Sequence, residues 1–304
     1  MSFSYSEIVR RVCTDPIEFL AECDAQYASR VEAAAEYAAG RREACPVILL
    51  SGPSASGKTT TAHLLTDALL RRGIRSHTGS MDDYFLSGGP KIAPKTPEGA
   101  PDLESPLCLD MELLSAHFLA LSRGEEVAVP EFDFTTQTRK PGPGRPLRLG
   151  KDEIAIFEGI HAMNPEIFAG ASATRIFVEA SEEVLRGNRV LLTAVENRFL
   201  RRAIRDRRFR NASGTETAAM WATVLRGETN YIQPYKHLAD VHIESAMASE
   251  LPVLRSAANP VLMDEGMPVW ARHYADILEE FPNIPESMVA DDSLLREFIG
   301  PRVK

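Results

Sequence analysis

Short runs of hydrophobic residues alternate along this chain with longer amphipathic stretches. The apolar runs predict strands at 47–50, before 79–85, and within 126–134, 152–160, 173–180 and 240–246. The amphipathic stretches predict helices at 58–72, 109–122, 182–208 and 213–231. Because strands alternate with helices, the pattern predicts an α/β fold around a parallel, doubly wound sheet.

The rest of the sequence divides into two flanking helical regions and one irregular loop. Residues 1–44, rich in Ala and Glu, predict a helical N-terminal extension, and 251–304 predict a helical C-terminal extension. The predicted α/β domain spans 45–250. Inside it, 87–106 holds five prolines and three glycines, so we expect irregular structure there. Loops of this length in compact domains are usually functional or disordered.

Charge and composition narrow the classes of partner. The chain has 304 residues and a formal net charge of -9, which argues against a general nucleic-acid or membrane-surface binder. No apolar run approaches the roughly 18 residues that span a bilayer, and the acidic start is not typical of a signal peptide. The four cysteines lack metal-ligand spacing. We therefore expect a cytoplasmic protein with reduced thiols and no membrane partner.

The stretch "VILLSGPSASGKTTTAHLL" (47–65) contains a phosphate-binding motif. It fits GxxxxGK[ST] between a predicted strand and a predicted helix, which predicts a loop whose backbone N–H groups surround phosphate oxygens. Lys58 would reach the β- and γ-phosphates, and Thr59 would ligate Mg²⁺. A tight strand-to-helix turn without ligand is the alternative. The predicted nucleotide-binding residues are Gly52, Ser54, Ala55, Ser56, Gly57, Lys58, Thr59 and Thr60.

Acidic residues follow two other predicted strands. Asp82 and Asp83 come at the end of the strand before "SMDDYF", beside the predicted phosphate loop, and one of them could accept the proton of an attacking hydroxyl. Glu158 ends the strand "IAIFE" and could hold Mg²⁺ through water. The alternatives are an Asp pair that caps a turn and an ordinary acid at a strand end.

Seven of the thirteen residues from 198 to 210 are arginines. One interpretation is a solvated helix, but few acids are available for pairing on this stretch. A second is nucleic-acid binding, for which one short run in an acidic protein is a weak signature. We favour the third: a mobile lid, at about 186–215, whose guanidinium groups neutralise a triphosphate.

Five motifs in order together resemble one family. "GPSASGKTT", "SMDDYF", "VPEFDFTTQTR", "FEGIHAMN" and "RRAIRDRRFR" look like the uridine kinase/phosphoribulokinase family of P-loop kinases, over about 45–245. The closing "DSLLREFIG" resembles the tail of a bacterial uridine-kinase-like branch. The resemblance implies a three-layer P-loop kinase fold with a parallel sheet and a helical lid, ATP as phosphate donor and Mg²⁺.

The resemblance also implies roles for individual residues. Asp82 would be the catalytic base, with Lys58 and the lid residues Arg202, Arg205 and Arg210 acting on the phosphates. Asp240 would lie near the adenine of ATP. The residues implied in binding the phosphoryl acceptor are Asp82, Phe85, Glu104, Phe132, Gln137, Arg139 and Arg202.

Several positions depart from the pattern of uridine kinases. Phe132 lacks the hydroxyl of the usual Tyr, Gln137 replaces an imidazole, and Glu104 is one methylene longer than the usual Asp. Ala212 stands where a second lid arginine is expected, and Met220 where a base-contacting Gln is expected. These changes leave the phosphoryl-transfer residues intact and put the identity of the acceptor in question.

The sequence therefore predicts an ATP-dependent kinase of a nucleoside 5′-hydroxyl, with uridine the leading acceptor. The first alternative is a P-loop kinase of another small alcohol, such as a sugar phosphate, pantothenate or glycerate. The second, from another class, is a nucleotide-dependent RNA-binding regulatory protein. We expect a small-molecule substrate and no nucleic-acid partner, and a homo-oligomer is compatible with the sequence.

Overall fold

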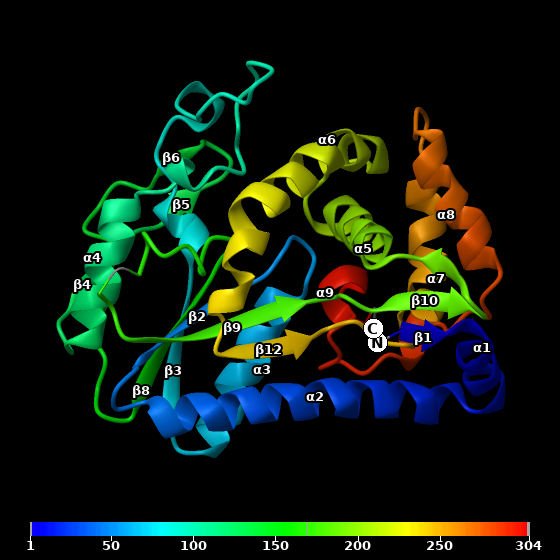
Figure 1. The fold of residues 1–304 in the computed structure, drawn as a ribbon, viewed down its shortest axis with the longest axis horizontal. Helices are drawn as coiled ribbons and strands as arrows, with labels where there is room; N and C mark the ends of the chain where they lie inside the picture. Colours follow the sequence, from blue (N-terminus) through cyan, green and yellow to red (C-terminus); the bar gives the residue numbers. More distant parts are fainter. Residues whose placement is uncertain (1, 169, 303–304) are drawn as a thin grey trace.

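A five-stranded parallel sheet forms the centre of the computed structural model, which describes residues 2–168 and 170–302. Its strands are β2 (Val47–Ser51), β3 (Arg75–Ser80), β8 (Glu153–Glu158), β9 (Ala173–Glu179) and β12 (Val241–Glu244). They lie in the order β12-β9-β2-β8-β3 (Figure 1). The central strand β2 pairs with β8 on one side and with β9 on the other. The predicted parallel α/β sheet is confirmed.

Helices cover both faces of the sheet and give three layers. On one face, α2 (Pro16–Arg41) and α3 (Lys58–Arg71) pack against apolar side chains such as Ile48 and Ile156. On the other, α4 (Met111–Ser122) packs Leu114 and Phe118 against Leu49. Alternate residues of β2 point to opposite faces, so its continuous apolar run is buried on both sides.

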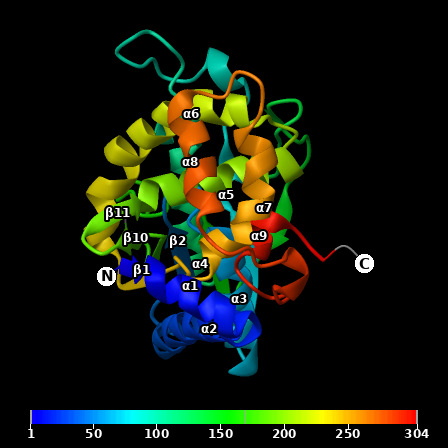
Figure 2. The same cartoon turned by 90° about the vertical axis from the view of Figure 1, so that its right-hand side faces the viewer.

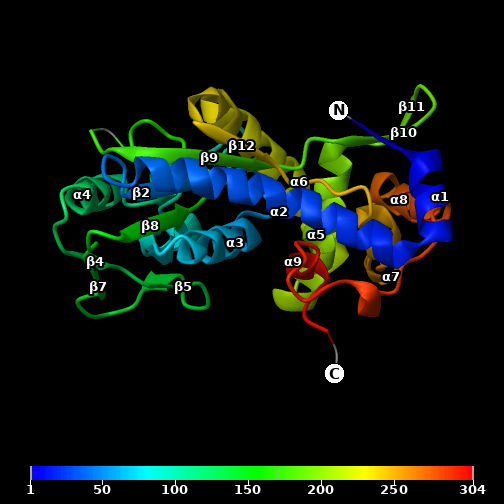
Figure 3. The same ribbon diagram turned by 90° about the horizontal axis from the view of Figure 1, so that it is seen from below.

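The N-terminal region is helical as predicted, apart from a short first strand. β1 (Ser2–Ser4) is followed by α1 (Tyr5–Thr14) and by α2. Asp15 starts α2 by accepting a hydrogen bond from Glu18 N, and Pro16 occupies the first turn. Seen from below, α2 runs along the molecule from α1 to β2 (Figure 3). Residue 1 of the predicted extension lies outside the described residues.

The prediction of one continuous helix over 182–208 is wrong in its first half. A hairpin of β10 (Glu183–Arg186) and β11 (Arg189–Leu192) precedes α5 (Ala194–Phe209). Gly187 makes the turn with a φ of 60°, and Thr193 begins α5 in a capping box with Glu196. The hairpin pairs with β1, from the other end of the sequence, which sequence periodicity cannot indicate.

The remaining strands form two small two-stranded sheets. β4 (Val127–Val129) pairs with β7 (Arg145–Leu147), and β5 (Phe132–Asp133) pairs with β6 (Thr138–Arg139). The helix that follows α5 is α6 (Gly214–Gly227). The segment 87–106, predicted to be irregular, contains the 3₁₀ turn Gly89–Lys91, an isolated bridge between Lys95 and Pro101, and the first residue of the 3₁₀ turn Pro106–Cys108.

The C-terminal region is helical as predicted and packs closely against α5. It contains α7 (Glu250–Leu262), α8 (Val269–Glu279) and α9 (Arg296–Ile299). Figure 2 shows α7 and α8 beside α5 and α6. One hydrophobic cluster joins side chains of α2, the sheet, α5 and these helices. The division at 44 and 250 stays a prediction, and residues 303–304 lie outside the described residues.

Within residues 2–168 and 170–302, no helix combines the length and the hydropathy needed to cross a bilayer.

Candidate active site

The phosphate loop lies at the carboxyl end of β2 and opens directly into α3. Gly52 has a φ of 155°, and a Cβ there would lie 2.0 Å from the carbonyl oxygen of Val178. Gly57 has a φ of 88°, and its Cβ would lie 2.6 Å from Leu294 Cδ1. Gly52 is therefore required by close packing against the backbone, and Gly57 by its positive φ. The loop has the curled form that the motif predicts, at the positive end of a helix.

Lys58 lies across the loop that precedes it. Its Nζ donates hydrogen bonds to the carbonyl oxygens of Gly52 at 2.9 Å and Pro53 at 3.0 Å. Loss of hydration lowers the pKa of Lys58, and the carboxylates of Glu158 and Glu297 oppose that shift. The ammonium group thus lies inside the cavity, beside carboxylates that stabilise its charged form.

One cavity of about 260 Å³ brings most of the predicted site residues together. Its wall includes residues 54–59 of the phosphate loop on one side and the 3₁₀ turn after β3 on the other. The predicted residues that line it are Ser54, Ala55, Ser56, Gly57, Lys58, Thr59, Asp82, Phe85, Glu104, Glu158, Arg202, Arg205 and Arg210. The phosphate-binding residues, the proposed base and the lid arginines, which were predicted from separate motifs, therefore line one cavity, here called the donor cavity.

The structure separates the two aspartates of "SMDDYF". Asp82 lines the cavity, and its backbone N–H is held by Ser80 Oγ at 3.2 Å. Loss of hydration raises the pKa of Asp82, while Lys58 opposes the shift. Asp83 instead accepts a hydrogen bond from Phe132 N at 3.2 Å. Of these two aspartates, Asp82 is the one placed to receive a proton from a molecule in the cavity.

Glu158 and Thr59 lie where a magnesium ion could be held. Ser80 Oγ donates to Glu158 Oε1 at 3.3 Å, and loss of hydration raises the pKa of Glu158. Among the described residues, no group of three or more His, Cys, Asp or Glu side chains could hold a metal ion. An ion here would take its other ligands from phosphate oxygens and water, as Mg²⁺ usually does.

The buried hydroxyl of Ser56 supports a phosphate-binding loop. The residue is fully buried, and within the described part of the chain its Oγ has no hydrogen-bond partner. A buried hydroxyl normally has a partner, so an orphan in a loop of this shape fits an oxygen-rich ligand. The residues present therefore fit a bound triphosphate.

Three lid arginines converge on one acid. Asp206, almost fully buried, forms ion pairs with Arg202 at 3.2 Å, Arg205 at 3.0 Å and Arg210 at 3.6 Å. Arg202 Nη1 also donates to Ser54 Oγ at 2.6 Å. Asp206 thus holds the three cavity arginines as a group, a role that the sequence analysis did not assign.

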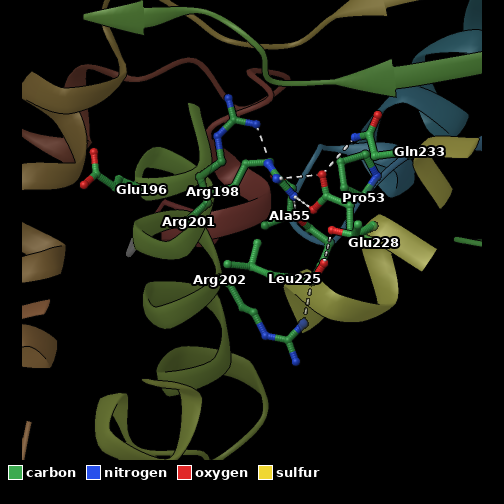
Figure 4. Close-up of polar contacts among 12 residues, drawn as sticks. Pro53, Ala55, Glu196, Arg198, Arg201, Arg202, Leu225, Glu228 and Gln233 are labelled. Atoms are coloured by element: carbon green, nitrogen blue, oxygen red, sulfur yellow. Dashed lines mark hydrogen bonds and ion pairs between the residues drawn. The ribbon is translucent and has the colours of Figure 1, made fainter. Parts of the chain in front are cut away.

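Two further arginines support the phosphate loop from outside the cavity (Figure 4). Arg198 forms an ion pair with Glu228 at 2.8 Å and donates to Ser54 O at 3.4 Å. Arg201, fully buried, pairs with Glu250 and donates to Ala55 O at 3.2 Å. Five of the seven arginines of the run therefore either line the cavity or hold the loop backbone in place.

Beside the donor cavity lies a smaller, mostly apolar cavity of about 140 Å³. Its aromatic wall is made by Phe85, Phe132 and Phe134, whose ring centroids are 5.1 to 6.0 Å apart. Gln137 lines it too, but its Nε2 donates to Phe134 O at 2.8 Å. Phe85 and Phe134 line both cavities, so the two spaces adjoin.

Glu104 reaches the donor cavity from the long loop 87–106. It packs against α6, where a Cβ on Gly227 would lie 2.4 Å from Glu104 Cβ. Loss of hydration raises the pKa of Glu104, and Arg202 opposes the shift. Asp102 fixes this part of the loop by accepting hydrogen bonds from Tyr231 Oη at 2.9 Å and from Arg226 at 3.1 Å. No sequence motif indicates this anchor.

Arg139 and Asp240, two of the predicted site residues, line neither cavity. Arg139 donates to Tyr84 O at 2.9 Å, to Phe85 O at 3.1 Å and to Asp110 at 3.0 Å, so it holds the chain after β3 in place. Asp240 precedes β12, and its carboxylate pairs with Arg175 at 3.0 Å. The structure does not bring either residue to the donor cavity, and an adenine contact for Asp240 stays a prediction.

Glu297, to which the sequence analysis gave no role, also lines the donor cavity. Its Oε2 accepts hydrogen bonds from Thr60 N at 3.1 Å and Thr60 Oγ1 at 2.8 Å. Because Glu297 lies 237 positions after Thr60, no local pattern could have indicated the contact.

The fold and the site define the class of protein: a phosphotransferase with a P-loop at the carboxyl edge of a parallel sheet. Residues 47–251 match the model of the phosphoribulokinase/uridine kinase family. The chain belongs to this family. It is a kinase that acts on an alcohol, and its family takes ATP as phosphate donor.

Curated relatives agree with this assignment. The uridine kinase of Deinococcus deserti is 26% identical over 198 residues, 65% of this chain and 86% of the relative. That of Lactobacillus johnsonii is 26% identical over 216 residues, 68% of this chain and 90% of the relative. A solved structure, described as a possible uridine kinase from Bacillus stearothermophilus, is 17% identical with a TM-score of 0.47, covering 70% of this chain and 98% of that one.

Proposed function

We propose that the protein transfers the γ-phosphate of ATP to the 5′-hydroxyl of a nucleoside, with uridine as the first candidate. The observation that carries the proposal is the shared cavity, in which Asp82 lies with the phosphate loop, Lys58 and the lid arginines. The similarity to uridine kinases supports the choice of acceptor.

On the donor side, the loop residues 52–57 and the first turn of α3 would bind the phosphates. Lys58 would exchange its bonds to the Gly52 and Pro53 carbonyls for phosphate oxygens. Arg202, Arg205 and Arg210 would face the transferring group and stabilise its charge. The work of the protein is positioning and electrostatic stabilisation, since phosphoryl transfer asks little covalent chemistry of it.

Asp82 would accept the proton of the attacking hydroxyl. Its raised pKa makes the carboxylate a stronger base than an ordinary aspartate. Lys58 and Arg210 oppose that shift in the pKa of Asp82 because their positive charges stabilise the ionised carboxylate.

Thr59 and Glu158 would hold Mg²⁺, the first through its hydroxyl and the second directly or through water. When bound, the ion supplies neutralisation of the phosphate charge.

The apolar cavity favours a second candidate acceptor. Uracil has several polar edges, and a wall made by Phe85, Phe132 and Phe134 offers them few partners. The two methyl groups beside the primary hydroxyl of an alcohol such as pantothenate would contact this aromatic wall without needing hydrogen-bond partners.

RNA binding is disfavoured because several arginines of the run are already paired with acidic side chains. Arg198 and Arg201 are buried in ion pairs, and Arg207 and Arg208 pair with Asp264 and Glu286. These acidic partners neutralise the positive charge that binding to an RNA phosphate backbone would require.

The cysteines support a cytoplasmic location. Cys23, Cys45 and Cys108 are buried, and all four cysteines, each within the described residues, are free of disulfides.

An ADP-release screen with Mg²⁺-ATP tests the proposal. The panel contains uridine, cytidine, ribulose 5-phosphate, pantothenate and glycerate, and Asp82→Asn protein serves as control. We expect uridine to stimulate ADP release most strongly. Stimulation only by pantothenate would select the second candidate, and stimulation by no alcohol would contradict a kinase of small alcohols.

A further inference from the structure

The C-terminal segment places a carboxylate on the phosphate loop. Glu297 lies in α9, and its Oε2 accepts from both the backbone N–H and the hydroxyl of Thr60. Thr60 belongs to the first turn of α3, immediately after the GK[ST] motif. The carboxylate of Glu297, which lines the donor cavity, therefore occupies two hydrogen-bond donors of the first turn of α3.

The backbone that carries Glu297 is firmly held. Leu294 and Phe298 are buried, the first against Gly57 and the second with its ring 4.9 Å from the guanidinium carbon of Arg201. Arg208 donates to Ile299 O. Because neighbours on both sides of Glu297 are packed into the core, the position of its Cα is fixed and only the side chain is free to turn.

A carboxylate and a phosphate oxygen would accept the same hydrogen bonds from Thr60. Both are anionic acceptors, and both are stabilised at the N-terminus of a helix. The two donors of Thr60 cannot serve Glu297 and a phosphate oxygen together. A metal-ligand role for Glu297 finds no support, since the described residues contain no group of three acidic, His or Cys side chains suited to a metal ion.

We propose that Glu297 is an affinity-determining residue, an internal anion that competes with the donor's phosphate for Thr60. The inference rests on the phosphate-binding role of the loop in the proposed function. When a phosphate oxygen takes the Thr60 donors, the Glu297 side chain turns away and stays near Lys58 and Arg201, whose charges it already interacts with. The competition weakens triphosphate binding and speeds the release of the nucleotide product.

Calorimetric titration of the full chain with inorganic tripolyphosphate, and separately with Mg²⁺-ATP, tests the inference. Glu297→Gln removes the charge and keeps the size. Asp291→Asn removes the same charge from an exposed position of the same segment and is the matched control. We expect about 3- to 30-fold tighter binding for Glu297→Gln, in line with a partly buried charge at a helix terminus, and wild-type binding for Asp291→Asn.

A second variant distinguishes the effect of occupying the Thr60 donors from the effect of the negative charge of Glu297. Glu297→Asp keeps the charge, but on a fixed backbone its shorter side chain cannot reach Thr60, so we expect binding tighter than wild type here too. Circular dichroism and melting curves check that each variant is folded. Unchanged or weaker binding by folded Glu297→Gln and Glu297→Asp proteins would overturn the role of Glu297 and leave the proposed function standing. Absence of tripolyphosphate and ATP binding in all the proteins would overturn both.

Discussion

Arg202 donates a hydrogen bond from Nη1 to the hydroxyl of Ser54 at 2.6 Å, which joins helix α5 to the phosphate loop. The two residues lie 148 positions apart. The same arginine pairs with Asp206, which also holds Arg205 and Arg210. The cations that would act on the donor are therefore positioned by the loop and by one buried acid together.

Replacing the proposed base should separate chemistry from binding. Asp82→Asn should lower kcat by about 10²- to 10⁴-fold, the usual contribution of a general base, with ATP affinity nearly unchanged. Steady-state kinetics and ATP titration measure the two effects. Asp83→Asn is the control, because Asp83 bonds to Phe132 N instead of lining the cavity. Wild-type turnover in Asp82→Asn protein would remove Asp82 from this role.

The pH dependence of kcat/KM should carry the signature of Asp82. The base acts when deprotonated, and loss of hydration raises its pKa above the ordinary value of about 3.9. Activity should therefore rise with pH through an acidic limb that lies above that value. The Asp82→Asn variant should lose this limb in its residual activity. A limb that persists unchanged in the variant would assign the titration to another group.

Removing the acid that gathers the lid arginines should affect both stability and catalysis. Asp206→Asn leaves Arg202, Arg205 and Arg210 without their shared partner, so we expect a loss of about 3 kcal/mol in the free energy of unfolding and at least a tenfold fall in kcat/KM. Denaturant unfolding and kinetics measure these changes. Glu32→Gln, which breaks an exposed pair with Arg72, should cost at most about 1 kcal/mol. Equal effects of the two changes would argue against a special role for Asp206.

The aromatic wall should determine how tightly the alcohol acceptor binds and should have little effect on the binding of ATP. Phe134 lines both cavities, so Phe134→Ala should raise the KM for the alcohol by about tenfold, as expected for the loss of a few aromatic contacts. The KM for ATP should change little. Val269→Ala, at a position that is 85% exposed and outside both cavities, is the control. A parallel rise of both KM values would place Phe134 in donor binding instead.

Much of the fold and of the donor side could be predicted because the signals are local. The apolar run 47–50, the GxxxxGK[ST] spacing and the aspartate pair after β3 each lie within one short segment. Position in a parallel sheet then brings the ends of these strands together. The predicted lid arginines 202, 205 and 210 also line the cavity.

The rest depends on partners that are distant in sequence. Helical periodicity at 182–208 gave no hint of the β10–β11 hairpin, whose partner strand begins at Ser2. Glu297 contacts Thr60 across 237 positions, and Arg201 is neutralised by Glu250. Sequence motifs also did not reveal that the donors of Arg139 are used on backbone carbonyls. Such pairings emerge only from tertiary packing.

Transfer of radioactive phosphate from [γ-³²P]ATP to uridine is the most direct measurement of the central claim. Purified wild-type protein with Mg²⁺ should produce labelled uridine 5′-monophosphate. Lys58→Ala protein, which lacks the cation held at the loop, should form it at a rate lower by orders of magnitude. Absence of label in uridine and in every other alcohol tested, with folded protein that binds ATP, would contradict the account.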